Sequence, residues 1–384
     1  MILPNYKDGS IVNLMSSISR SFGVKNKYKP LKLLPPQELK KAKNVVLLVL
    51  DGLGYEYLKK KKNSYLKSVL TGKITSVFLS TTAAAITTFA TGVAPQQHAC
   101  TGWFMYLNEI GLVSTILPFV PRAGGPVLSK LGVNIEQIIG EKNLASRIKA
   151  KSYFIIQKYL NSSDFTKNAS KKSKSLTYNT LDGLFSQIKR AIKSSNQKKY
   201  IYSYWPKFDS FAHTFGINSK KTAQHFSELD SKLKKFIETI KNTNTILLIS
   251  ADHGLIDTTK KTRLVLESHP RLKECLTLPL CGDARVAYCY VKPSKTKQFE
   301  KYVKSKLGKF CWLRKSSDML KKNYFGLFKP NPKLLDRIGD YTLIMKENYT
   351  LKDRLANEKR EINVGDHGGV SKEEMFVPLI VIKT

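Results

Sequence analysis

The chain has 384 residues, of which 42% are hydrophobic, so it can bury a large core and intrinsic disorder is excluded as its main state. Its formal charge of +36 favours anionic partners such as nucleotides, nucleic acid or anionic lipid. Most of the basic residues are lysines in scattered runs, which predict a solvated surface more than a dedicated nucleic-acid-binding face. The runs are Lys59–Lys62, Lys171–Lys172, Lys220–Lys221 and Lys234–Lys235.

Targeting signals and disulfides are not expected. The N-terminal residues lack the basic start and apolar run of a secretory signal, and no stretch approaches the ~20 apolar residues that span a bilayer. The five cysteines are odd in number and include no CxxC pair, which argues against a disulfide framework or a structural zinc knot. We therefore expect a cytoplasmic protein with reduced cysteines and no transmembrane segment.

In chain order, residues 1–43 are a polar lead-in, and residues 44–384 are expected to form one α/β domain. The first strand is Asn44–Leu50, a continuous apolar run typical of a parallel strand buried on both faces. Asp51 follows it directly, at the edge where open α/β sheets gather their ligands. Similar strands are predicted over Tyr200–Tyr204 and Thr245–Ser250. The candidates to complete the sheet are Arg285–Val291, Tyr341–Met345 and Phe376–Ile382.

Helices are predicted over Ala83–Ala90, Leu181–Lys193 and Ser219–Lys241. Thr81 and Thr82 open the first of these, where free backbone N–H groups and the helix dipole favour an anion. A simple helix cap is the alternative role for this pair. Two long connections, around residues 103–180 and 258–340, are expected to be cap-type insertions that carry the substrate side.

Acidic and imidazole side chains recur after the predicted strands and once near the C-terminus. They are Asp51, Asp209 with His213, Asp252 with His253, and His367. Asp209 and His213 are four residues apart, so on a helical turn they face the same way. Mixed oxygen and nitrogen donors suit zinc or manganese better than calcium or magnesium. With a threonine hydroxyl there are seven candidate ligand groups, too many for one zinc ion, and they suit two.

The order of these motifs resembles the type I phosphodiesterase and nucleotide pyrophosphatase family of the alkaline phosphatase superfamily. The matching residues are Asp51-Gly52, Phe78-Leu-Ser-Thr-Thr82 with Thr91-Gly92, Asp209-x-x-x-His213, Asp252-His253-Gly254 and His367-Gly368-Gly369. The resemblance implies an alkaline-phosphatase-like fold, with a mostly parallel central sheet flanked by helices and cap-type insertions. It also implies a metal-dependent hydrolase of phosphate diesters or pyrophosphates, with nucleotides as candidate substrates.

The resemblance further implies roles for individual residues. Thr82 would be the nucleophile and would form a phospho-threonine intermediate. Two divalent ions, zinc or alternatively manganese, would be bound by seven side chains. One ion would be held by Asp51, Thr82, Asp252 and His253, and the other by Asp209, His213 and His367.

The chain departs from the family where an asparagine often helps to hold a phosphate oxygen, because Ala83, Ala84 and Ala85 follow Thr82. Backbone N–H groups or another donor would then have to bind the phosphate oxygens. Trp103 and Tyr106 are candidates for stacking on a planar group, with packing as the alternative. Arg285 is a candidate phosphate contact, with a salt bridge to Asp283 or a neighbour as the alternative.

Two other functions stay open at this point. One is a phosphomonoesterase or phosphonate hydrolase of the same superfamily, which would use the same ligands. The other is a basic nucleic-acid-binding protein without catalysis, which the charge permits but which leaves the candidate ligands unexplained.

Overall fold

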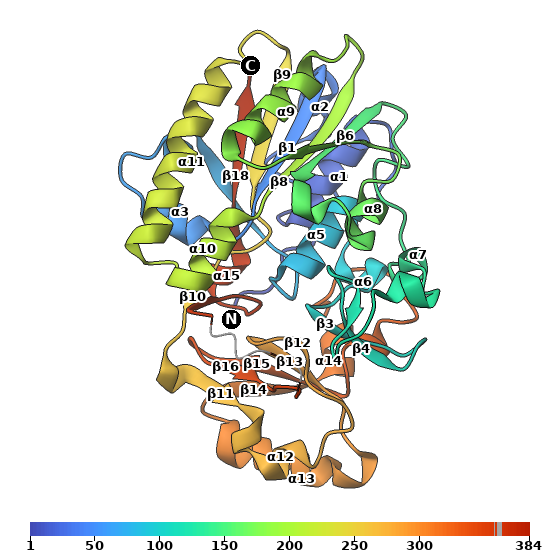
Figure 1. Cartoon of the computed structure of the whole chain (residues 1–384). Coiled ribbons are helices and arrows are strands. Elements are labelled where there is room, and N and C mark those ends of the chain that lie inside the picture. Colours follow the sequence, from blue (N-terminus) through green and yellow to red (C-terminus); the bar gives the residue numbers. More distant parts are fainter. Residues whose placement is uncertain (357, 359–362) are drawn as a thin grey trace.

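The core of the protein is a seven-stranded sheet of order β2-β18-β9-β1-β8-β6-β7, seen in the upper half of Figure 1. The computed structural model describes residues 1–356, 358 and 363–384. Five neighbouring strands, from β9 to β7, run parallel, whereas β18 is antiparallel to β2 and β9, so the predicted mostly parallel sheet is confirmed. The strands are β1 (Asn44–Leu50), β2 (Leu70–Thr75), β6 (Lys151–Gln157), β7 (Lys174–Tyr178), β8 (Lys199–Trp205), β9 (Thr245–Ser250) and β18 (Phe376–Lys383).

The three central strands end at the same level. All seven residues of β1 are buried, as its continuous apolar sequence predicts for a strand covered on both faces. Leu50 lies opposite Trp205 of β8, and Val49 lies opposite Ser250 of β9. The loops that follow β1, β8 and β9 therefore meet at one edge of the sheet.

Helices lie on both faces of this sheet (Figure 1). On one face α9 (Leu181–Lys193) contacts β6, β7 and β8, with α11 (Lys220–Glu238) packed beside it. On the other face α5 (Thr82–Thr91) contacts α1 (Ile11–Ser21), whose buried apolar side chains join the main core. The remaining α-helices are α2 (Pro36–Lys40), α3 (Tyr55–Lys59), α4 (Tyr65–Ser68), α6 (Pro95–His98), α7 (Ile135–Ile138), α8 (Asp164–Ala169), α10 (Lys207–Phe215), α12 (Pro270–Lys273), α13 (Thr296–Tyr302), α14 (Ser316–Lys321) and α15 (Lys372–Met375).

A second seven-stranded sheet, of order β14-β15-β13-β12-β3-β4-β5 and antiparallel throughout, lies in the lower half of Figure 1. Two segments that we expected in the central sheet, β13 and β15, belong here instead. Both are fully buried apolar runs, so their pattern is the same as that of a central parallel strand. The strands are β3 (Phe104–Leu107), β4 (Leu112–Thr115), β5 (Val120–Pro121), β12 (Cys281–Asp283), β13 (Val286–Cys289), β14 (Cys311–Lys315) and β15 (Tyr341–Met345).

Two short strand pairs lie outside the two large sheets. β10 (Ile256–Asp257) pairs with β17 (Gly365–Asp366), and β11 (Arg263–Val265) pairs with β16 (Thr350–Lys352). Strands of the second sheet come from both predicted insertions, whereas β6 and β7, also within residues 103–180, are strands of the central sheet. The division of the chain at residue 43 stays a prediction.

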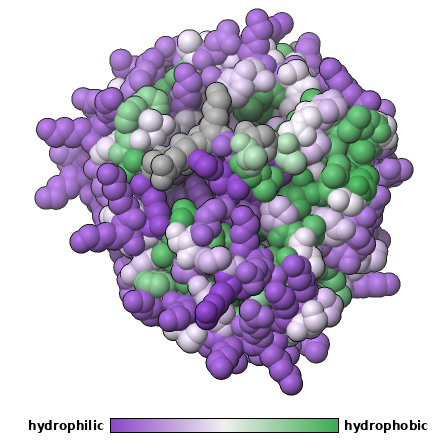
Figure 2. Space-filling view, turned by 60° about the horizontal axis from the view of Figure 1, so that its bottom comes forward, coloured by the Kyte–Doolittle hydropathy of each residue, from purple (hydrophilic) through white to green (hydrophobic). Residues whose placement is uncertain are grey.

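Hydrophilic side chains cover most of the face in Figure 2, interrupted by a hydrophobic area on its right. The paired lysines at residues 171–172, 220–221 and 234–235 are all exposed. All five cysteines are free and buried. Within the part of the chain that the structure describes, none of the helices has the length and apolar content needed to cross a bilayer.

Candidate metal centre and active site

Three carboxylates meet at the edge where β1, β8 and β9 end. Asp51 follows β1, Asp252 follows β9, and Asp209 lies on α10, just after β8. Asp252 Oδ1 accepts hydrogen bonds from the backbone N–H groups of Gly52 and His253, both at 3.0 Å, and so joins two of the loops. The Tyr204 hydroxyl, from β8, donates to Asp51 Oδ2.

Asp51, Asp252 and His253 form the first ligand cluster, with one donor atom from each within 4.8 Å of the others. His253 Nε2 lies 3.4 Å from Asp51 Oδ1 and 3.5 Å from Asp252 Oδ2. Both of these carboxylate oxygens are buried, and neither accepts a hydrogen bond from the part of the chain that the structure describes. Burial, together with the charges of Asp252 and Asp209, raises the pKa of Asp51 well above its usual value. Such crowded, unpaired oxygens fit a divalent cation.

Asp209, His253 and His367 form the second cluster, again with donor atoms within 4.8 Å. His213, one turn after Asp209 on α10, places its Nε2 3.2 Å from Asp209 Oδ2, as the four-residue spacing predicted. Its Nδ1 donates to the Gly365 carbonyl at 2.8 Å, which orients Nε2 toward Asp209 and the second cluster. His253 and His367 stack with ring centres 3.7 Å apart, so His253 lies between the two clusters.

The ionisable groups of the second cluster shift one another's pKa values. Burial opposes protonation of His213, but the Asp209 carboxylate outweighs it and raises the pKa of His213 to about 9. Burial likewise opposes ionisation of Asp209, yet His213 holds the pKa of Asp209 well below its usual range. Burial and the neighbouring His253 lower the pKa of His367. Both effects favour the neutral imidazole of His367, which is the form that binds metal.

The close approach of these loops requires glycine. A Cβ on Gly254 would lie 2.0 Å from the Glu373 carbonyl oxygen and 2.8 Å from the Gly54 Cα. Gly368 has a φ of +105°, and a Cβ there would lie 3.0 Å from the Asp283 Cβ. The glycines after His253 and His367 thus let backbone enter a crowded site, as the sequence predicted.

The two threonines at the start of α5, which the sequence alone left equivalent, have different surroundings. Thr81 occupies the N-cap position, is fully buried, and donates its hydroxyl to Asp283 Oδ2 at 2.5 Å. Thr82 is partly exposed, and its Oγ1 lies 3.0 Å from His253 Nε2. The Thr82 hydroxyl is therefore the one that faces the ligand clusters. Asp283 has no sequence pattern that marks it as a site residue.

The three residues predicted to contact substrate, Arg285, Trp103 and Tyr106, do not belong to the two ligand clusters. Arg285 is buried and forms an ion pair with Glu374 rather than Asp283. Its five N–H donors all reach protein acceptors, which are the two Glu374 oxygens and the carbonyls of Lys346, Glu347 and Tyr349. No donor of Arg285 is left for a phosphate. Trp103 and Tyr106 are half-buried, with Tyr106 on β3 of the second sheet and Trp103 just before that strand. The rings of Tyr106 and Tyr290 pack with their centres 5.3 Å apart.

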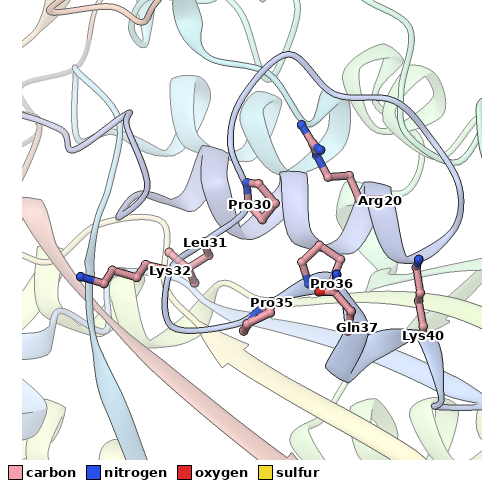
Figure 3. A pocket seen from close by; sticks show the side chains of 8 residues that line it. All are labelled: Arg20, Pro30, Leu31, Lys32, Pro35, Pro36, Gln37 and Lys40. Atoms are coloured by element: carbon pink, nitrogen blue, oxygen red, sulfur yellow. The ribbon is translucent and has the colours of Figure 1, made fainter.

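A surface pocket lies apart from these residues, beside α1 and α2 (Figure 3). It is lined by three basic residues and three prolines, among others: Arg20, Lys32, Lys40, Pro30, Pro35 and Pro36. None of the candidate ligands lines it, so the chemistry of the site does not extend to this pocket.

Known proteins resemble this chain in family and in fold. The family model of type I phosphodiesterase / nucleotide pyrophosphatase matches residues 45–370. No curated protein matches in sequence. Among solved structures, murine ectonucleotide pyrophosphatase / phosphodiesterase 5 is similar, with a TM-score of 0.66, 17% identity and 87% of each chain covered. The human protein of the same name has the same TM-score, with 16% identity and coverage of 88% of this chain and 87% of its own.

These structural likenesses support the alkaline-phosphatase-like fold, and the family model spans most of the chain, including every candidate ligand. The chain therefore belongs to the type I phosphodiesterase / nucleotide pyrophosphatase family and is a hydrolase of the phosphodiesterase type.

Proposed function

We propose that this protein hydrolyses phosphodiester or pyrophosphate bonds in nucleotides or similar small phosphate esters, through a covalent phosphoryl group on Thr82. The proposal includes two divalent ions, with zinc preferred and manganese as the alternative. One observation carries it: the partly exposed Thr82 hydroxyl lies 3.0 Å from His253, the residue shared by two clusters of buried metal-ligating groups.

The residues present suit divalent cations, because the carboxylate oxygens Asp51 Oδ1, Asp209 Oδ1 and Asp252 Oδ2 are buried and meet no hydrogen-bond donor among the described residues. Asp51, Thr82, Asp252 and His253 would hold one ion, and Asp209, His213 and His367 the other. When bound, the ions would lower the pKa of the threonine hydroxyl and neutralise charge on the phosphoryl group.

The reaction would proceed in two displacements at phosphorus. Thr82 Oγ loses its proton to solvent and attacks phosphorus, while the bond from phosphorus to the leaving oxygen breaks and that oxygen takes up a proton. Water then attacks the same phosphorus, the bond to Thr82 Oγ breaks, and the hydroxyl is restored as a phosphate monoester leaves. The free N–H groups at the start of α5 would hold phosphate oxygens in place of the missing asparagine.

A relative supports both the nucleophile and the substrate class. Murine ectonucleotide pyrophosphatase / phosphodiesterase 5 has been solved as an inactive variant, with a threonine changed to alanine, in complex with AMP. By analogy we extend a catalytic threonine and nucleotide binding to this chain. Ala83 to Ala85 do not indicate which phosphate ester is the substrate, because they stand where the family often has a phosphate-binding asparagine.

The test uses the purified protein, stripped with a chelator and reloaded with zinc or manganese. We expect hydrolysis of bis(p-nitrophenyl) phosphate, loss of at least a thousandfold in kcat for Thr82→Ala, and retention of activity in Thr81→Ala as the matched control. Acid quenching followed by mass spectrometry should find phosphate on the peptide that contains Thr82. Retained activity in Thr82→Ala would refute the nucleophile, and faster hydrolysis of p-nitrophenyl phosphate would favour the phosphomonoesterase alternative.

A further inference from the structure

We propose that Asp283 is a positioning residue that holds the Thr81 hydroxyl away from the start of α5, so that the backbone N–H groups there are open to the substrate phosphate. The proposal rests on the proposed function and deepens it. It assigns to the second sheet a part in phosphate binding that the family motifs in this sequence do not indicate.

The contact between Thr81 and Asp283 is unusual for a helix start. Thr81 has the extended backbone of an N-cap residue, with φ −133° and ψ 150°, but its side chain makes no cap hydrogen bond. A threonine in this position ordinarily accepts a hydrogen bond from the second or third N–H group of the helix. Here the hydroxyl instead donates to Asp283 Oδ2, at the end of β12 in the second sheet.

The consequence is a helix start whose donors meet no side-chain acceptor among the residues that the structure describes. The first N–H group of α5 with an acceptor inside the helix is that of Ala85, which donates to the Thr81 carbonyl at 3.0 Å. The earlier groups, on Thr82, Ala83 and Ala84, precede any such acceptor. The first turn of α5 contains no acidic residue, and the side chains of Ala83 and Ala84 are apolar and buried.

Independent observations point to a ligand site beside this helix start. The Thr82 hydroxyl lies 3.0 Å from His253 Nε2, which is itself within 3.5 Å of the two buried carboxylate oxygens that accept no hydrogen bond. A phosphorus atom attacked by Thr82 Oγ would carry its other oxygens directly beside the open N–H groups. A capping hydroxyl on Thr81 would compete with those oxygens for the same donors.

The alternative explanation is a purely structural role, in which the contact between Thr81 and Asp283 only attaches α5 to the second sheet. The buried Arg285–Glu374 ion pair ties the second sheet to the segment after His367, because Glu374 Oε1 also accepts the Gly369 N–H at 2.7 Å, but this pair does not involve α5. The two explanations differ in how variants at Thr81 and Asp283 combine.

The experiment is a double-mutant cycle measured on the metal-loaded protein with bis(p-nitrophenyl) phosphate. Asp283→Ala frees the Thr81 hydroxyl to cap the helix and should lower kcat/KM about fivefold, the competition expected from one cap hydrogen bond. Adding Thr81→Ala removes the capping group and should restore most of the loss. Asp283→Asn keeps an acceptor for Thr81 and should retain more than half of the wild-type value, which separates the hydrogen bond from the charge.

A second readout needs neither metal nor substrate. Amide hydrogen exchange in the peptide that contains Ala83 and Ala84 should slow in Asp283→Ala and return to the wild-type rate in the double variant. If Asp283→Ala does not fold, Asp283→Ser, whose shorter side chain does not reach Thr81, takes its place. A double variant no more active than Asp283→Ala, or unchanged exchange, would overturn the proposal. Loss of activity in Thr82→Ala measured alongside shows that the proposed function holds even if this inference fails.

Discussion

Replacing Arg285 by methionine should destabilise the whole protein rather than weaken substrate binding. Arg285 and Glu374 are 1% and 0% exposed, and their ion pair is 3.0 Å long. In the variant, Glu374 would keep the N–H bonds of Gly369 and Ser371 but lose its cation, while three backbone carbonyls would lose a donor. Removing one partner of a buried pair costs about 3–5 kcal/mol, so we expect a fall of that size in the free energy of unfolding.

Urea denaturation followed by tryptophan fluorescence measures this loss. Arg314→Met is the matched control, because Arg314 is exposed on β14 of the same sheet and should change stability by less than about 0.5 kcal/mol. Equal stability of the two variants would refute the structural reasoning. A stable Arg285→Met protein with a KM raised about tenfold would show instead that Arg285 contacts phosphate.

Three further outcomes follow from the charges and the ligand clusters. Zinc or manganese should raise the melting temperature of the metal-stripped protein, because a cation relieves the repulsion between the carboxylates of Asp51 and Asp252. Scanning fluorimetry during a metal titration measures this rise, which should be smaller in Asp252→Asn. A rise of the same size in Asp252→Asn and in the wild type would contradict the prediction. Burial and the nearby Arg337 lower the pKa of His98 to about 3, so the folded state holds it neutral while the unfolded chain protonates it below about pH 6.5. The free energy of unfolding should therefore fall as the pH drops from 6.5 toward 3, with a shallower slope in His98→Gln, and parallel slopes in urea titrations would refute this. The net charge of +36 attracts anionic substrates, and salt screens this attraction. Added salt should therefore lower kcat/KM for an anionic diester and leave kcat constant. Stopped-flow or steady-state rates at a series of salt concentrations test this, and a kcat/KM independent of salt would contradict it.

The sequence predicted secondary structure best in segments whose residue pattern is set by a single requirement, such as burial on both faces. β1, β9 and α9 have the predicted bounds, because a strand buried on both faces and an amphipathic helix each impose a clear pattern. The ligands on α10 were recognisable for the same reason, since a four-residue spacing has a fixed meaning on a helix. Arg285 shows the limit, because the acceptors around a side chain are set by segments distant in sequence.

Features that arise from contacts between distant segments could not be predicted from local sequence patterns. β13 and β15 are as apolar as the central strands, and the sequence does not tell which sheet a fully buried strand joins. The helix α1 had a usable signal in Ile11, Leu14 and Ile18, whose spacing matches one helix face, but the surrounding polar residues masked it. The Thr81–Asp283 contact joins positions 202 residues apart, and no local pattern reports such a pairing.

The aligned ends of β1, β8 and β9 also bear on when the proposed metal site forms during folding. Asn44 pairs with Lys199 on one side and with Thr245 on the other, so the ligand-bearing loops are assembled from widely separated parts of the chain. Contacts of such long range form late in folding, because loop closure must be completed before they stabilise anything. Binding of the proposed ions therefore requires the assembled central sheet, and the recovery of metal binding after denaturation would report when that sheet is complete.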